Sequence, residues 1–208
     1  MDAPKSLASA EERRLRLALL DALHVAPLTR FVVDLRAQMG PEYSIPNFDP
    51  LDGVSNAACL FLLEAPGPNA ITSGFISRNN PDETAKNFFL LNQEASIGRT
   101  RTVAWNVVPW YVGSGTRIRA ANASNTRLAL PALTKLLQLL TRLRIVALID
   151  RKAATAREAV TSLCPIARIF TLPHPSPMFV NRSPHNRERI LVALREVAAA
   201  LNSGISDG

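Results

Sequence analysis

Short runs of consecutive apolar residues recur along the chain, and segments with apolar side chains at helical spacing separate them. Continuous apolar runs are typical of strands that are buried on both faces of a sheet. The runs lie at residues 57–66, 102–110, 145–150 and 167–173, and the helical patterns between them lie at 79–91, 130–143 and 152–163. This alternation predicts an α/β fold, a three-layer α/β/α sandwich with a central, mainly parallel four-stranded sheet.

The first part of the chain has a different pattern. Residues 10–39 carry apolar side chains at helical spacing, and Pro27 is expected to interrupt this helical stretch because proline lacks a backbone N–H. The segment 40–53, GPEYSIPNFDPLDG, combines prolines with Asp-Pro and Asp-Gly pairs, which predicts an ordered loop. The 208 residues fit one domain, with N-terminal helices and a loop over 1–50 and the α/β core over 51–208.

Capping residues indicate where two of the predicted helices begin. Asn80 is a suitable N-cap, and Pro81 suits the first helical position after it. Ser183 and Pro184 are expected to begin the last helix, which is expected to stop near Gly204. Both helices follow a strand and a loop, as the layered arrangement requires.

The chain is basic, with 24 Lys and Arg against 17 Asp and Glu, which gives a formal charge of +7. This charge favours polyanionic partners, and most of it comes from arginine, which binds phosphate with two hydrogen bonds. No apolar run reaches the length of about 18 residues that a membrane helix needs. Because no signal-peptide pattern opens the chain either, we expect no membrane attachment and a place in the bacterial cytosol, associated with the nucleoid.

The cysteines and histidines do not suggest a metal centre. Cys59 and Cys164 are far apart in the sequence, and we expect them to be buried, reduced thiols. Two cysteines and three histidines also fail to match the ligand spacing of zinc or iron–sulfur sites. We therefore expect no metal and no other cofactor.

Polar and proline-rich segments follow three of the predicted strands. They are EAPGPNA (64–70), NVVPWYVG (106–113) and PHPSP (173–177). Ligands of open parallel sheets bind beyond the carboxyl ends of the strands, so these segments are expected to form one site. His174 lies between two prolines, which restrict the backbone and hold the imidazole in place.

Asn106 stands where an apolar strand ends, and two explanations fit it. Its buried amide could bond a neighbouring loop, because a buried carboxamide needs partners for its donors and its acceptor. Alternatively, it could donate to a carbonyl oxygen and accept from the adjacent ring N–H of a flat heterocycle. That pattern is the edge of uracil, whereas cytosine presents the opposite pattern and would be rejected by a factor on the order of 10⁴.

Three motifs resemble those of a known enzyme superfamily. LEAPGP (63–68), NVVPW (106–110) and HPSP (174–177), in this order, are similar to the signature motifs of the uracil-DNA glycosylase superfamily, and the match runs from Glu64 to Arg182. The resemblance implies a monofunctional DNA glycosylase. Such an enzyme flips uracil out of DNA, hydrolyses its N-glycosidic bond and leaves an abasic site, which initiates base excision repair.

The resemblance also implies roles for individual residues. His174 would donate a hydrogen bond to O2 of uracil as negative charge develops there, and Glu64 would position the attacking water. The residues expected to contact uracil are Ala65, Pro66, Gly67, Phe75 and Asn106. Phe75 would stack on the flipped base, although the residue pattern by itself favours a core position for it.

A second group of residues is expected to contact DNA. Its members are Ser176, Pro177, Met178, Phe179 and Arg182. The first two would contact the phosphate backbone, and Met178 with Phe179 would form an apolar wedge in the vacated base stack. Further phosphate contacts are expected from Arg187, Arg117 and Arg119, whereas His185, at a helix start, is expected to make only local hydrogen bonds.

The chain departs from the superfamily pattern at several positions. Leu63 replaces a usual glycine, and Ala65 stands where the best-known family has a water-activating aspartate. The families that share the EAPG sequence commonly carry four cluster cysteines, which this chain lacks. Gly67 occupies the place of a tyrosine that excludes thymine, so a broader substrate range is open.

Three functions remain open from the sequence. The first is an active, monomeric glycosylase that acts on single- or double-stranded uracil-containing DNA and releases free uracil. The second is a protein on the same scaffold that binds DNA lesions without catalysis or accepts hypoxanthine, xanthine or mismatched bases. The third is a nucleotide-binding protein that uses VGSGTR (112–117) as a phosphate loop, although this segment lacks the Lys-Ser or Lys-Thr ending of a P-loop.

Overall fold

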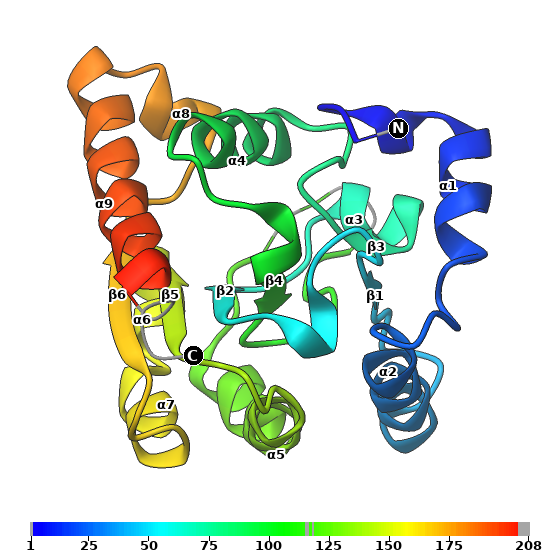
Figure 1. Ribbon diagram of the computed structural model, residues 1–208. Helices are drawn as coiled ribbons and strands as arrows, with labels where there is room; N and C mark the ends of the chain where they lie inside the picture. Colours follow the sequence, from blue (N-terminus) through cyan, green and yellow to red (C-terminus); the bar gives the residue numbers. More distant parts are fainter. Residues whose placement is uncertain (1, 115–116, 118, 204–208) are drawn as a thin grey trace.

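The computed structural model describes residues 2–114, 117 and 119–203. A four-stranded sheet lies at its centre (Figure 1), with strands β2 (Cys59–Leu63), β4 (Thr102–Asn106), β5 (Ile145–Ile149) and β6 (Arg168–Leu172). The strand order is β4-β2-β5-β6, and every pairing is parallel. The predicted α/β class and four-stranded parallel sheet are therefore confirmed.

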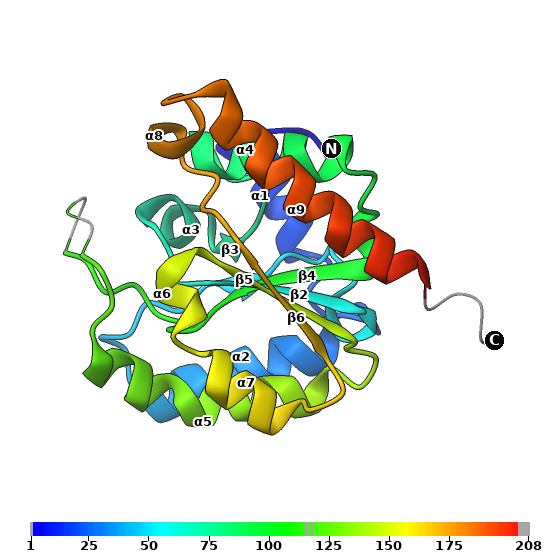
Figure 2. The same cartoon turned by 90° about the vertical axis from the view of Figure 1, so that its left-hand side faces the viewer.

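Helices cover both faces of this sheet, which gives the three predicted layers (Figure 2). On one face lie α4 (Glu83–Glu94), α8 (Pro177–Val180) and α9 (Pro184–Ser203), and on the other lie α2 (Ala26–Met39), α5 (Ala123–Leu139) and α7 (Arg157–Leu163). The remaining elements are η1 (Ser6–Ala8), α1 (Ala10–Leu17), β1 (Asn47–Phe48), η2 (Val54–Asn56), α3 (Pro68–Ser73), β3 (Phe75–Ile76), η3 (Arg99–Arg101) and α6 (Asp150–Ala154).

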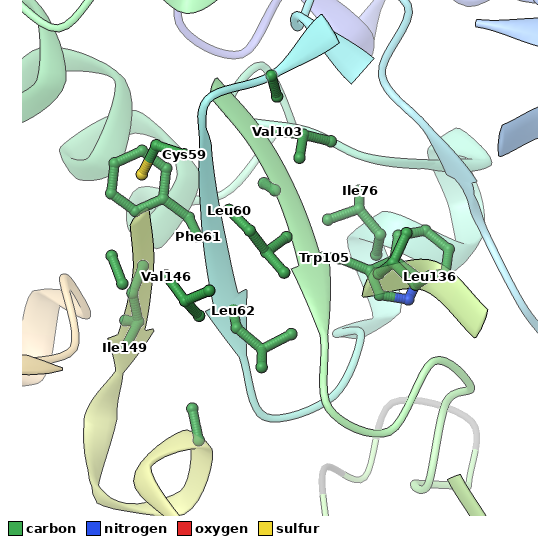
Figure 3. Packing of buried hydrophobic residues seen from close by; sticks show 14 of the residues in the cluster. Cys59, Leu60, Phe61, Leu62, Ile76, Val103, Trp105, Leu136, Val146 and Ile149 are labelled. Atoms are coloured by element: carbon green, nitrogen blue, oxygen red, sulfur yellow. The ribbon is translucent and has the colours of Figure 1, made fainter. Parts of the chain in front are cut away.

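The strands are buried on both faces, as their continuous apolar sequences predict. Phe61 of β2 packs edge-on against Phe88 of α4, with ring centroids 5.0 Å apart. Trp105 of β4 stacks on Phe48 at 3.7 Å and meets Phe31 of α2 at 6.3 Å. Figure 3 shows Phe61 and Trp105 among the apolar side chains of β2, β4 and β5 that form the core.

The register places the carboxyl ends of the four strands at one edge of the sheet. Leu63 pairs with Asn106, Leu62 pairs with Leu148, and Ile149 pairs with Leu172. In Figure 2, helices α3, α6 and α8 lie at this same end. The segments that follow the strands are therefore neighbours, as expected from the sequence.

The structure corrects the predicted start of two helices. Pro27 does not interrupt a helix: α1 ends at Leu17, and Pro27 stands in the first turn of α2, where its missing N–H has no intrahelical partner to lose. The N-cap of α4 is Asp82, whose side chain accepts from the Ala85 N–H (2.8 Å), and not Asn80. Asn80 is buried and donates to the Phe75 carbonyl (3.0 Å).

Other short elements also differ from the prediction. The expected helix over 152–163 is two helices, α6 and α7, and a second, two-stranded parallel sheet pairs β1 with β3. The last helix begins at Pro184 as predicted, and its expected end near Gly204 lies outside the described residues. Within the described part of the chain, none of the helices has both the length and the apolar composition that crossing a membrane requires.

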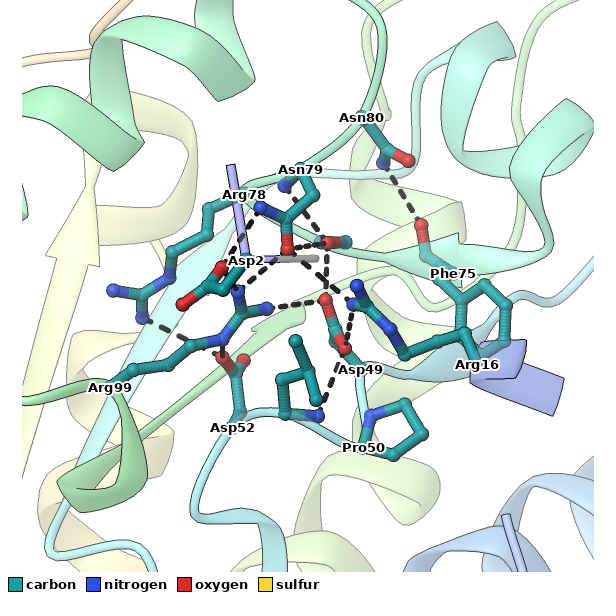
Figure 4. A network of polar contacts seen from close by, with 12 residues as sticks. Asp2, Arg16, Asp49, Pro50, Asp52, Phe75, Arg78, Asn79, Asn80 and Arg99 are labelled. Atoms are coloured by element: carbon teal, nitrogen blue, oxygen red, sulfur yellow. Dashed lines mark hydrogen bonds and ion pairs between the residues drawn. The ribbon is translucent and has the colours of Figure 1, made fainter. Parts of the chain in front are cut away.

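A buried network of charges fixes the N-terminal segment to the core (Figure 4). Asp49 is fully buried and forms ion pairs with Arg16 of α1 and Arg99 of η3, and the Ser77 hydroxyl donates to it. Arg99 also donates to Asp52 (2.8 Å). Burial acts to raise the pKa of Asp49, but the Arg99 and Arg16 cations outweigh it and hold the pKa below its ordinary value.

Candidate active site

A cavity of about 940 Å³ opens at the carboxyl edge of the sheet. Each of the four strands contributes a polar side chain to this cavity at its carboxyl end: Asn106 from β4, Glu64 after β2, Asp150 after β5 and His174 after β6. Because the strand order is β4-β2-β5-β6, the two carboxylates lie between the amide and the imidazole. The sheet thus brings together groups that are up to 110 residues apart in sequence.

Apolar and small residues form much of the rest of the cavity wall. They come from the end of β2, from α3, from the segment before α4, from α4 itself and from α8; among them are Ala65, Pro66, Ala70, Ile76, Ala85, Phe88 and Phe179. A concave, largely apolar site with a few convergent polar groups is the usual form of a site for a small molecule or a single base.

The side chain of Asn106 is 3% exposed, and its Nδ2 has no hydrogen-bond partner within the described residues. An unpaired buried donor destabilises the fold by about 1–3 kcal/mol. The structure therefore does not satisfy this donor through a loop, the first of the two explanations considered above. The Asn106 amide is available to a ligand with an acceptor oxygen.

Glu64 is held by a backbone donor. The Ala121 N–H donates to its Oε1 (2.6 Å), which ties the segment before α5 to the end of β2. The Glu64 carbonyl also accepts from the Val108 N–H (2.9 Å). One carboxylate oxygen of Glu64 thus has a structural partner, while the side chain still lines the cavity.

His174 is positioned by its neighbours in the PHPSP segment. Asn87 of α4 donates to the Pro175 carbonyl (3.0 Å), and the Ser176 hydroxyl caps α8 by accepting from the Phe179 N–H (3.3 Å). Burial lowers the pKa of His174 below its ordinary value, although the carboxylates of Asp150, Glu64 and Asp82 act to raise it. His174 is therefore a neutral imidazole near pH 7, with one N–H to donate.

Asp150 was not identified from the sequence. It follows β5 with a φ of 76°, a left-handed conformation that is uncommon for a residue with a side chain, and it lines the cavity. The signal was present, because IVALID ends in an aspartate at the sheet edge where ligands bind. The motifs that carried the family resemblance come from the other three strands and give no indication at β5.

The other expected uracil contacts divide between the cavity wall and the core. Ala65, Pro66 and Gly67 line the cavity. Phe75 does not: its side chain is 0% exposed, and the neighbouring Ile76 lines the cavity instead. The stacking position predicted for Phe75 is thus wrong for this structure, and the core position that the residue pattern favoured is the one observed.

The expected DNA contacts divide into two groups. Ser176 and Phe179 line the cavity, whereas Pro177, Met178 and Arg182 lie outside its wall. Met178 stands on α8 with 81% of its surface exposed, and Arg182 is also exposed. Pro177 and Met178 lie in sequence between the lining residues Ser176 and Phe179, and Arg182 follows Phe179 by three residues.

The arginines at the cavity are not the ones that the sequence suggested. Arg187 forms an ion pair with Glu94 (2.5 Å), and Arg119 donates to the Val112 carbonyl (3.0 Å). Arg151 and Arg189 line the cavity instead, and Arg189 lies 5.8 Å from the ring centroid of Phe179. Arg151 lies in α6 and Arg189 in α9, so the packing of these two helices brings both side chains to the site, which the motifs did not indicate.

Three other predictions concern residues away from the cavity. Cys59 is buried, and burial raises the pKa of its thiol, whereas Cys164 is only half-buried; both cysteines are free. Arg117 is exposed, and the segment 112–117 that was considered as a phosphate loop includes residues 115–116, which lie outside the described part. Within residues 2–114, 117 and 119–203, no group of His, Cys, Asp or Glu could hold a metal ion.

No protein-family model and no curated protein sequence matches this chain. Among solved structures, the solution NMR structure of a proposed uracil DNA glycosylase from Methanosarcina acetivorans aligns with a TM-score of 0.47 and 15% sequence identity. The alignment covers 69% of this chain and 92% of the other. The function proposed below rests on the cavity and its side chains.

Proposed function

We propose that this protein is a monofunctional DNA glycosylase that removes uracil from DNA by hydrolysis of the N-glycosidic bond. The observation that carries the proposal is the buried, unpartnered Nδ2 of Asn106, which shares a cavity with the neutral imidazole of His174. The motifs around these two residues support the same reading. Single- or double-stranded uracil-containing DNA is the proposed substrate, free uracil is the product, and the proposed working unit is a monomer.

Asn106 would select the base. Its Nδ2 donates to O4 of uracil, and its Oδ1 accepts from N3–H, so the donor that has no protein partner gains one. Cytosine offers an amino donor and a bare ring nitrogen at the same positions, which would leave both amide groups facing like groups. A buried site that depends on such pairing discriminates strongly, because the wrong base leaves desolvated polar groups unpaired.

His174 would stabilise the leaving base. As the bond between the sugar and N1 breaks, the electron pair moves into the uracil ring and negative charge develops on O2. A neutral imidazole that donates its N–H to O2 stabilises this charge without any need to carry a proton of its own. The donor is held by the Pro175 and Ser176 contacts before the reaction begins, so little reorganisation is needed.

The surroundings of the cavity suit a DNA strand from which one nucleotide is flipped. Arg151 and Arg189 at the cavity, with Arg182 beside it, would pair with phosphates on either side of the flipped nucleotide. Met178 is an exposed apolar side chain next to the cavity and would fill the gap that the base leaves.

One observation favours a broader base range as a second candidate function. An ideal Cβ built at Gly67 meets nothing within 4 Å, so the cavity wall is open at this position. The cavity of about 940 Å³ is also roomy for one pyrimidine. Purine lesions such as hypoxanthine and xanthine therefore belong among the substrates to be tested, as does binding without excision.

The test is excision from oligonucleotides that carry one uracil, hypoxanthine, xanthine, thymine or cytosine, in single- and double-stranded form. We expect release of uracil, and a loss of about 10²–10³ in the single-turnover rate for His174→Ala, the range typical of one donor to a developing anion. Asn106→Asp should lose uracil excision because its carboxylate cannot donate to O4.

The matched controls are His185→Ala and Asn181→Asp, both at exposed positions outside the cavity. They should excise uracil at the wild-type rate. Tight binding of the uracil oligonucleotide with no release of base would replace the proposal with the lesion-binding function. A protein that neither binds the uracil oligonucleotide nor releases a base from it would refute both functions.

A further inference from the structure

Asp150 has a backbone conformation that needs an explanation. Its φ of 76° lies in the left-handed region, which a side chain makes unfavourable for every residue except glycine and, to a lesser degree, asparagine and aspartate. Such conformations persist where the surrounding structure imposes them, and they are concentrated at functional sites. The strained residue here lies in the cavity already described.

The strand register places Asp150 between Glu64 and His174. Leu148 of β5 pairs with Leu62 of β2, so Asp150 and Glu64 are each two residues beyond this pair. Ile149 pairs with Leu172 of β6, so Asp150 follows this pair by one residue and His174 by two, on adjacent strands. Adjacent strands lie only about 4.8 Å apart, which keeps these side chains within reach of one small group between them.

Within the described residues, the carboxylate of Asp150 accepts no hydrogen bond and forms no ion pair. Its negative charge acts to raise the pKa of His174. Glu64, by contrast, has one oxygen bound to the Ala121 N–H at 2.6 Å. Of the two carboxylates between Asn106 and His174, Asp150 is the one with both oxygens available.

We propose that Asp150, and not Glu64, is the carboxylate that orients and deprotonates the water in the hydrolysis. The assignment rests on the function proposed above. In this step the water oxygen forms a bond to C1′ of the sugar, and the bond between C1′ and N1 of uracil breaks. The electron pair of that bond goes to the uracil ring, whose O2 accepts from His174, and one water proton goes to the Asp150 carboxylate. Return of this proton to the uracil anion completes the balance and restores the carboxylate.

Asn106 gives this arrangement an independent anchor. Its buried, unpartnered Nδ2 marks where a base would be held, at the β4 side of the cavity. A base bound there with O2 toward His174 lies above the ends of β2 and β5. Its sugar is then next to the carboxylates, where the water must stand.

The test compares three variants of the full chain on the single-uracil oligonucleotide. Asp150→Asn keeps the size of the side chain and its tolerance of a left-handed φ but removes the charge. Asp150→Gly removes the side chain and the backbone strain together, and Glu64→Gln is the matched substitution at the other carboxylate. The readouts are the single-turnover rate of uracil release, the affinity for the oligonucleotide and the thermal midpoint.

We expect both Asp150 variants to lose a factor of about 10²–10⁴ in rate, the usual contribution of a general base. Their affinity for DNA should stay equal or increase, because a negative charge near the phosphates is removed. Asp150→Gly should melt no lower than the wild type, which separates a chemical loss from a folding defect. Glu64→Gln should reduce the single-turnover rate by a smaller factor than either Asp150 variant.

Three results would overturn the assignment. If the wild type releases uracil and the Asp150 variants release it within threefold of the same rate, Asp150 is a loop residue and the proposed function stands without it. If Glu64→Gln reduces the single-turnover rate more than Asp150→Asn does, Glu64 is the general base. A wild type that releases no base from any oligonucleotide would remove both the proposed function and this role.

Discussion

The substitution Asp49→Asn should destabilise the protein strongly, although Asp49 is not in the cavity. The carboxylate is fully buried, pairs with Arg16 and Arg99, and also accepts from the Leu51 N–H (3.0 Å) and the Ser77 hydroxyl. An asparagine keeps the shape but leaves the buried guanidinium of Arg16 without its counter-charge, while Arg99 keeps its ion pairs with Asp52 and Asp2. Removal of one partner from a buried ion pair reduces the free energy of unfolding by about 3–5 kcal/mol.

The assay is urea unfolding at pH 7, together with thermal unfolding. For a domain of this size, each kcal/mol lowers the melting temperature by about 2–4 °C, so a decrease of roughly 6–20 °C is expected. The control is Glu94→Gln, which breaks the exposed ion pair with Arg187 and should change stability by no more than about 1 kcal/mol. An exposed ion pair contributes up to about 1 kcal/mol. The reasoning would be refuted if Asp49→Asn lowered the free energy of unfolding by no more than this ~1 kcal/mol.

Two further predictions concern the cavity. Burial lowers the pKa of His174, so the folded chain binds this proton more weakly than the unfolded chain does. As the pH falls through about 6.5, the unfolded chain is protonated first, and the free energy of unfolding decreases. The free energy of unfolding in urea should decrease less between about pH 7.5 and pH 5.5 for His174→Gln than for the wild type. These pH values lie about one unit on either side of the ordinary histidine pKa. Equal decreases in the two proteins would contradict the prediction. Gly67→Tyr should fill the open part of the cavity wall and weaken the inhibition of uracil excision by free thymine about tenfold relative to inhibition by free uracil. Gly98→Tyr, which lies outside the cavity, should leave this ratio unchanged.

The parallel sheet could be predicted because its strands are buried on both faces and their sequences are continuously apolar. The small β1-β3 sheet could not, because each strand has two residues, too few for a pattern. The same limit applies to α3 and α8, which have six and four residues. The N-cap of α4 was assigned to Asn80 because Pro81 follows it, but Asn80 bonds the Phe75 carbonyl and the helix begins two residues later.

The site was predictable to the extent that it follows the carboxyl ends of strands. Asn106, Glu64 and His174 were each found at a strand end, and parallel pairing then made them neighbours. Phe75 was misplaced because a motif position gives no information about side-chain burial, and the structure buries this ring completely. Arg151 and Arg189 were missed because their approach to the cavity depends on how α6 and α9 pack.

Asp150 shows why the sheet, and not the motifs, is the better guide to the chemistry. The resemblance drew attention to β2, β4 and β6, and the missing aspartate at position 65 then looked like the loss of a base. In an open parallel sheet every strand end faces the same crevice, so a carboxylate from β5 can reach the place that one from β2 would occupy. In the glycosylase proposed above, the left-handed Asp150 at the end of β5 would supply the carboxylate that position 65 lacks. In the proposed reaction, the position of the carboxylate relative to C1′ matters, and not the strand from which it comes.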